Sequence, residues 1–146
     1  MKAKDYLQKV SKLDKMIKNK MVEIEQWKAV AMGTTAPSDG ERVQASGSQQ
    51  KMADAVCRYV EIEKQLDKCI DRLIDTKQDV IRTIEQLPEN EYDLLHRIYI
   101  QGKTMDDVAD AYGKTYSWAT TVHGRALKRV QNILDGRAGD QNGGIS

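Results

Sequence analysis

The sequence predicts an all-α protein in which a long, coiled-coil-like helical hairpin precedes a domain of three short helices. Charged residues make up 31% of the 146 residues, only two are proline, and phenylalanine is absent. This composition is typical of long helices, because sheet cores are built from aromatic and β-branched residues. Two stretches repeat apolar residues at spacings of three and four, and glycines divide the C-terminal third into short segments.

The overall charge and hydropathy exclude several classes of protein. The 23 Lys and Arg residues against 22 Asp and Glu residues give a formal net charge of +1, which argues against a uniformly basic nucleic-acid coat. No apolar run approaches the ~20 residues that span a bilayer, and the opening MKAKDYLQKVSK lacks the apolar stretch of a signal peptide. We therefore expect a cytoplasmic protein with no membrane partner.

Residues that carry chemistry are sparse. A helix would hold Cys57 and Cys69 ~18 Å apart, too far for a disulfide, and with His96 and His123 they form no zinc spacing. We expect both thiols to be structural or inert, with Cys57 on the outer side reacting faster with a thiol reagent if the hairpin is monomeric. No phosphate-binding, metalloprotease or nucleophile-elbow motif is visible, so the sequence predicts neither an enzyme nor a cofactor.

The first predicted element is an amphipathic helix over residues 3–32. Its apolar residues follow the heptad spacing of a coiled-coil seam, which Lys20 interrupts once. The seam positions are Tyr6, Val10, Leu13, Ile17, Ile24, Trp27 and Ala31.

A mobile loop over residues 33–50 and a second helix from about residue 48 to residue 87 follow. The loop holds three of the ten glycines and one of the two prolines, and the helix contains neither type after Ser48. We expect residues 1–87 to form an antiparallel hairpin or its dimeric equivalent, a homo-oligomer through the long helices. The second seam comprises Tyr59, Ile62, Leu66, Ile70, Leu73, Val80, Ile84 and Leu87.

Capping signals divide residues 88–135 into three short helices. Asn90, with Asp93 three residues later, is a plausible N-cap for the first. Thr104 and Asp107 have the spacing of a capping box for the second. Gly102 and Gly113 end these two helices, Thr115 caps the third, and residues 136–146 are expected to be disordered.

Three short helices with a tight turn before the third match a tri-helical helix-turn-helix, whose third helix lies in the DNA major groove. Residues 88–112 contain two basic and six acidic side chains, a local net of −4. Residues 113–137 contain five basic and one acidic side chain, a local net of +4. This polarity would orient one edge of residues 88–135 toward phosphate and predicts double-stranded DNA as the partner.

The segment VADAYGKTYSWATTVHGRAL resembles region 4 of sigma-70 factors. The resemblance rests on a small Ala in the short helix, a Gly at the turn and an Arg-Ala-Leu triplet twelve residues further on. It covers about residues 87–134, while the whole chain is similar to small phage and prophage proteins of the sigma-70 region 4-like class, described as transcription regulators. The resemblance implies a bacterial host cell as location.

Applied to this chain, the resemblance implies that some residues of the second and third short helices pack inside the domain and that others contact DNA. Val108, Ala109, Tyr112, Ala119, Ala126, Leu127 and Val130 would pack inside. The candidate DNA contacts would be Lys114, Tyr116, Ser117, Thr120, Thr121, Arg125 and Lys128. Because recognition helices bring their N-terminal residues closest to the bases, we expect Lys114, Arg125 and Lys128 to contact phosphates and the others to face base edges.

Three neighbouring side chains have simpler expectations. His123 is expected to be a buried, neutral histidine. Gly124 costs ~1 kcal/mol relative to Ala within a helix and predicts a close approach of another helix or of DNA. Trp118 is expected in the core, which leaves Tyr116 as the more exposed aromatic residue.

The leading functional hypothesis is a DNA-binding transcription regulator, with contact to RNA polymerase as an open further possibility. Residues 1–87 form two heptad-bearing helices and contain no equivalent of sigma region 2, so the chain cannot be a complete sigma factor. Two alternatives stay open: a small terminase-type DNA-packaging subunit, and a structural coiled-coil adaptor. A ring of subunits would favour packaging, and a monomer or dimer would favour transcription.

Overall fold

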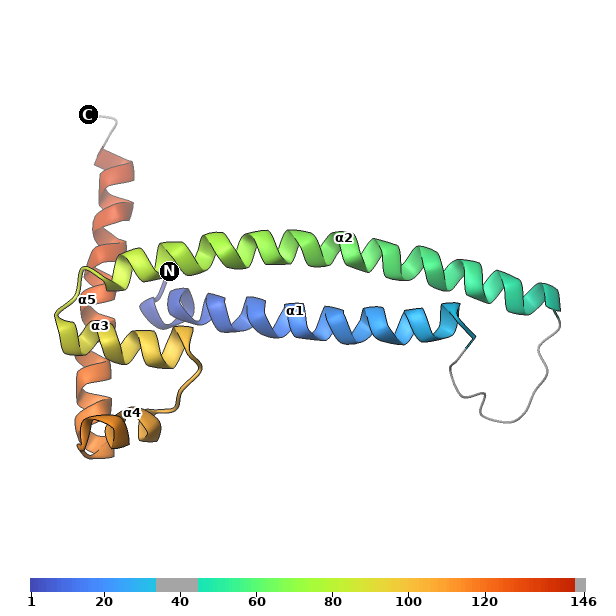
Figure 1. Ribbon diagram of the computed structural model, residues 1–146. Coiled ribbons are helices and arrows are strands. Elements are labelled where there is room, and N and C mark those ends of the chain that lie inside the picture. Colours follow the sequence, from blue (N-terminus) through green and yellow to red (C-terminus); the bar gives the residue numbers. More distant parts are fainter. Residues whose placement is uncertain (34–44, 144–146) are drawn as a thin grey trace. The chain divides into compact units, whose positions relative to one another are not determined.

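The computed structural model describes residues 1–33 and 45–143, and all regular structure in these ranges is helical. The elements are α1 (Ala3–Ala31), α2 (Ala45–Ile84), α3 (Glu89–Leu95), the π-helix η1 (His96–Ile100), α4 (Met105–Tyr112) and α5 (Tyr116–Gly143) (Figure 1). None of the helices within these ranges has the length and apolar character needed to cross a membrane. The predicted all-α class is therefore confirmed.

Two of the predicted boundaries differ from the structure. The predicted loop at residues 33–50 lies mostly outside the described residues, but α2 already begins at Ala45. The predicted disorder of residues 136–146 is contradicted as far as Gly143, where α5 ends, and residues 144–146 lie outside the described part. Arg137 gives a physical reason, because its guanidinium binds Thr83 of α2 and thereby orders this end of α5.

The chain divides into two compact units, and the division differs from the predicted boundary at residue 88. One unit comprises Leu13–Arg72, the middle of the α1–α2 pair. The other joins Met1–Lys12 to Leu73–Ser146, so it contains the first turns of α1, the end of α2 and all later helices. The ends of the two long helices therefore belong with the C-terminal helices.

In the Leu13–Arg72 unit, α1 and α2 pair in antiparallel order within one chain. Met16 Sδ lies 3.6 Å from Cys69 Sγ, and Lys20 Nζ donates to Gln65 Oε1 at 3.0 Å. Lys28 Nζ lies 3.9 Å from Glu63 Oε1. The α2 partner moves back along the sequence as α1 moves forward, which is the signature of an antiparallel pair (Figure 1).

Two seam residues were predicted wrongly, since Trp27 of α1 and Ile70 of α2 are each 37% exposed. Beside Ile70, Cys69 is buried at 8% exposure. The step from Leu66 to Cys69 to Leu73 keeps the three-and-four spacing, and one residue further turns a side chain by about 100° away from the partner helix. Cys57 is exposed, which agrees with the expectation that its thiol reacts faster than that of Cys69.

The core of the other unit joins side chains from all six helices named above. Tyr6, Leu7 and Val10 of α1 lie in the same buried cluster as Leu94 and Leu95 of α3. Because these α1 residues pack in this cluster, the first turns of α1 belong to this unit and not to the Leu13–Arg72 unit. The remaining buried members are Ala3, Val80, Ile84, Leu87, Tyr99, Val108, Ala109, Ala119, Val122, Ala126 and Val130.

Polar contacts reinforce this core. The Tyr6 hydroxyl donates to the Asp79 carboxylate and lies 2.9 Å from Thr83 Oγ1. Arg137 Nη2 of α5 donates to the same Thr83 oxygen at 2.6 Å. Gln131 of α5 accepts a hydrogen bond from the Ala3 N–H at 2.7 Å. These contacts hold α1, α2 and α5 together at both the core and its edge.

Candidate nucleic-acid interface

The turns before and after α4 fix the start of α5, where most candidate contacts lie. The Thr104 side chain accepts from the Asp107 N–H at 3.1 Å, and the Asp107 carboxylate accepts from the Thr104 N–H at 2.9 Å. The predicted capping box is confirmed, and these hydrogen bonds hold the pKa of Asp107 below its ordinary value. Gly113 ends α4 with φ +63°, a conformation that side chains disfavour, as predicted.

The first of the three helices begins differently from the prediction. α3 starts at Glu89 after Pro88, and Pro88 offers no side-chain cap, so Asn90 is not the N-cap. The helix then widens into η1, where the Gln101 N–H donates to the His96 carbonyl at 3.0 Å. No local sequence signal separates such a π-turn from an ordinary α-helix. Gly102, with φ +75°, terminates the segment as predicted.

A cluster around Asp93 connects α3 and η1 with α4 and α5. Arg97 Nε donates to Asp93 Oδ2 at 2.8 Å, and the Tyr112 hydroxyl of α4 donates to the same oxygen. The Tyr112 ring lies 5.2 Å from the Trp118 ring of α5. Burial and the hydrogen bond to Asp93 raise the pKa of Tyr112 to about 12, so its hydroxyl keeps its proton at neutral pH.

The carboxylate at the centre of this cluster stays ionised. Burial alone would raise the pKa of Asp93, but the hydrogen bonds from Tyr112 and Arg97 outweigh it and bring the pKa below its ordinary value. The sequence analysis missed this cluster, although Asp93 and Arg97 have the four-residue spacing of a helical ion pair. Trp118 is half-buried, in line with its expected packing role.

His123 is half-buried and hydrogen-bonded. Its Nε2 lies 2.7 Å from the Tyr99 hydroxyl, and the two rings stack with centroids 5.8 Å apart. Burial, and then the charge of Lys4, lower the pKa of His123 below its ordinary value, which favours the neutral form expected from the sequence. A Cβ at Gly124 would meet no atom within 4 Å, so no other helix of the described chain approaches it closely, contrary to that part of the prediction.

The inward face of α5 matches the resemblance. Ala119, Ala126 and Val130 are fully buried, as are Val108 and Ala109 of α4 to within 3% exposure. Tyr112 and Leu127 are half-buried. The residues expected to pack inside therefore do so, and Val122 joins them.

The candidate contact residues lie on the outward side of α5 and at its start. Tyr116 is 57% exposed, and Thr120 is half-buried rather than exposed. The Thr120 and Thr121 hydroxyls both donate to the Ser117 carbonyl at 2.9 Å, so their remaining capacity is to accept. The other exposed candidates are Lys114, Ser117, Thr121, Arg125 and Lys128.

Five of these candidates form one stripe. Residues 117, 121, 125 and 128 are separated by three or four positions and therefore share one face of α5, and Lys114 lies in the turn just before this helix. In the described part of the chain, the Lys114, Arg125 and Lys128 side chains make no hydrogen bond or ion pair within the chain. We call residues 114, 117, 121, 125 and 128 the basic stripe.

The other two cations of residues 113–137 have partners within the fold. Arg129 Nε donates to Glu91 Oε1 at 3.1 Å and lies 2.8 Å from Oε2, which is buried and accepts no hydrogen bond. Arg137 Nη1 lies 3.6 Å from Asp79 Oδ2. The local net charge of +4 counted from the sequence therefore overstates the charge that is free to meet a ligand.

Neither metal chemistry nor similarity to known proteins assigns a role to these residues. No group of three or more His, Cys, Asp and Glu side chains in the described ranges could hold a metal ion. Comparison with models of protein families, with curated proteins and with solved structures found no match to this chain.

Proposed function

We propose that residues 104–129 act as a helix-turn-helix that binds double-stranded DNA, and that the protein is a transcription regulator of the sigma-70 region 4-like phage or prophage class. α4 is the supporting helix and α5 is the recognition helix. The resemblance adds RNA polymerase as a second partner, to be tested separately. The protein acts in this proposal as a binding module and not as an enzyme.

The basic stripe is the observation that supports this proposal. Its three cations are unpaired within the described chain, while neighbouring Arg129 and Arg137 are used internally. Ser117 and Thr121 lie between the cations on the same face, where they can reach base edges. On a helix face that contacts only water, there is no reason for some cations to be ion-paired within the fold while the cations on one face are all left unpaired.

The size of the expected effect follows from counterion release. Three phosphate contacts give a salt slope of about −2.7, so affinity should fall about 40-fold between 50 and 200 mM salt. Dispersed surface cations without a defined site give weak binding that selection from random DNA cannot improve. A selected duplex titrated at several salt concentrations therefore tests the proposal directly.

Replacing Arg125 with Ala should weaken binding to every DNA sequence several-fold and lower the salt slope by about one. Lys68→Ala is the matched control, because Lys68 is an exposed cation on α2 and its loss changes the net charge equally. Thr121→Ala should instead change the preference among sites and leave the slope nearly unchanged. The proposal fails if no duplex binds more tightly than ~10⁻⁴ M, or if Lys68→Ala and Arg125→Ala behave alike.

A further inference from the structure

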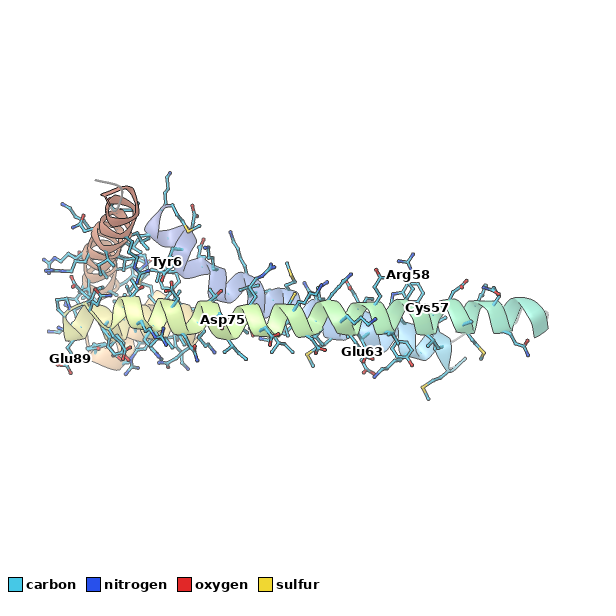
Figure 2. The ribbon with its side chains drawn as sticks, turned by 90° about the horizontal axis from the view of Figure 1, so that it is seen from above. Tyr6, Cys57, Arg58, Glu63, Asp75 and Glu89 are labelled. Atoms are coloured by element: carbon cyan, nitrogen blue, oxygen red, sulfur yellow. The ribbon has the colours of Figure 1, made fainter. Side chains whose placement is uncertain are left out.

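One flank of the α1–α2 pair presents apolar side chains that nothing in the described chain covers. Met21 of α1 is 53% exposed, and Val60 and Ile70 of α2 are 40% and 37% exposed. Figure 2 shows Glu63 and Arg58 on opposite sides of α2, so these two residues mark its two flanks. On the flank of Glu63, a groove of about 310 Å³ is lined by Met21, Ile24, Glu25, Lys28, Glu63, Leu66 and Asp67.

The α2 side of this flank has a two-fold pattern. Positions 60 and 70 are symmetric about residue 65, and both carry β-branched apolar residues. Positions 63 and 67 are symmetric about the same residue, and both carry carboxylates. An interface between identical copies requires such self-complementary spacing.

The α1 side has a matching pattern, with opposite charges. Lys18 and Glu25 are nearly symmetric about Met21, and so are Asp14 and Lys28. The α1 and α2 centres lie at the same level, because Lys20 Nζ donates to Gln65 Oε1 at 3.0 Å. One two-fold axis can therefore serve both helices.

We propose that this flank binds a second copy of the chain, forming an antiparallel four-helix dimer. α1 faces α1 and α2 faces α2 of the second copy, with the axis beside Met21 and at the level of residue 65. Val60 then meets Ile70 of the second copy, Lys18 meets its Glu25, and Asp14 meets its Lys28. This inference does not rest on DNA binding.

The charges on α1 favour this orientation. Lys18 and Asp14 already form an ion pair within α1 at 3.0 Å, and Lys28 Nζ lies 3.9 Å from Glu63 Oε1, so the second copy would extend these pairs. In the proposed orientation, α1 contributes two opposite-charge pairs per copy. On α2, Glu63 of each copy then lies near Asp67 of the other copy, and these two carboxylates repel each other.

The area predicts a reversible dimer. The stretch from residue 14 to residue 28 of α1 is about 21 Å long, and two adjacent helices are about 20 Å wide, so each copy offers roughly 400 Å². Stable interfaces bury about 800 Å² per partner, so we expect dissociation in the micromolar range.

Cysteine cross-linking tests the position of the axis. In a Cys57→Ser background, Met21→Cys should give a disulfide-linked dimer under mild oxidation, because the two residues face each other across the axis. Glu23→Cys is the matched control, since Glu23 is also exposed on α1 but lies on the opposite flank. Equal cross-linking of the two variants would overturn the proposed orientation.

Sedimentation over a concentration series tests the interface itself. Val60→Asp should raise the dimer dissociation constant at least tenfold without loss of helicity, because Val60 is already 40% exposed. Asp67→Asn should lower it several-fold, since it removes the repulsion with Glu63 of the second copy. A monomer at every concentration, or a larger ring, would overturn the proposal.

Discussion

Replacing Leu7 with Ala is expected to lower the free energy of unfolding of the unit that joins Met1–Lys12 to Leu73–Ser146 by about 2–5 kcal/mol. Leu7 is fully buried, and it shares one cluster with Leu94, Leu95 and Val130. Removing its branched end opens a cavity among these side chains, and interior packing is too dense to collapse without cost. A change near the start of the chain should therefore loosen the helices that carry the basic stripe.

Urea denaturation followed by Trp118 fluorescence measures this effect. Trp27 is the second tryptophan and lies in the Leu13–Arg72 unit, so a Trp27→Phe background makes the signal specific. Val22→Ala is the control, because Val22 is 55% exposed and should change stability by less than about 0.5 kcal/mol. An unchanged Trp118 transition in Leu7→Ala would contradict the assignment of the first turns of α1 to this unit.

Local signals in the sequence were sufficient for much of the fold. The capping box at Thr104 and Asp107, the terminating Gly102 and Gly113, and the Thr115 cap were all predicted correctly. Each of these features involves atoms within a few residues of one another, so the spacing of residue types determines them. The heptad spacing predicted that α1 and α2 pair through their seams, but it left open whether they pair within one chain or between two chains.

Contacts between distant residues could not be predicted from such signals. Nothing near Tyr6 indicates that its hydroxyl meets Asp79, and nothing near Arg137 indicates that it binds Thr83. These contacts join α1 and α5 to the end of α2 within one unit, and neither that grouping nor the continuation of α5 to Gly143 was predicted. At Ile70, the apolar character was read correctly but the face was not, because a one-residue shift within a helix changes the exposed side.

The sequence predicted which side of α5 carries the candidate contacts, but it did not predict which of the cations there are left unpaired. The spacing of residues 114 to 128 places most candidate contacts outward, and only Thr120 is half-buried. Which cations are unpaired depends on acidic side chains from α2 and α3, which the sequence does not bring together visibly. Arg125 and Arg129 are four residues apart and look equivalent in the sequence, yet their roles differ.

Arg129→Ala is expected to destabilise the protein by about 2–3 kcal/mol while leaving the salt slope of DNA binding unchanged. The Glu91 side chain is 8% exposed, and Arg129 is its ion-pair partner. Breaking a fully buried pair costs about 3–5 kcal/mol, because one charge remains without compensation. The Arg129 side chain is 57% exposed, so water reaches the site and reduces the cost.

A double-mutant cycle separates this penalty from lost packing. Glu91→Gln removes the buried charge, so it should destabilise the wild type but restore part of the stability of Arg129→Ala. Arg125→Ala is the matched control, since it removes an arginine of the same helix that has no partner in the described chain; it should change stability by less than about 0.5 kcal/mol. If Arg129→Ala lowers the salt slope by about one and leaves the unfolding transition in place, Arg129 contacts phosphate and the division between structural and unpaired cations is wrong.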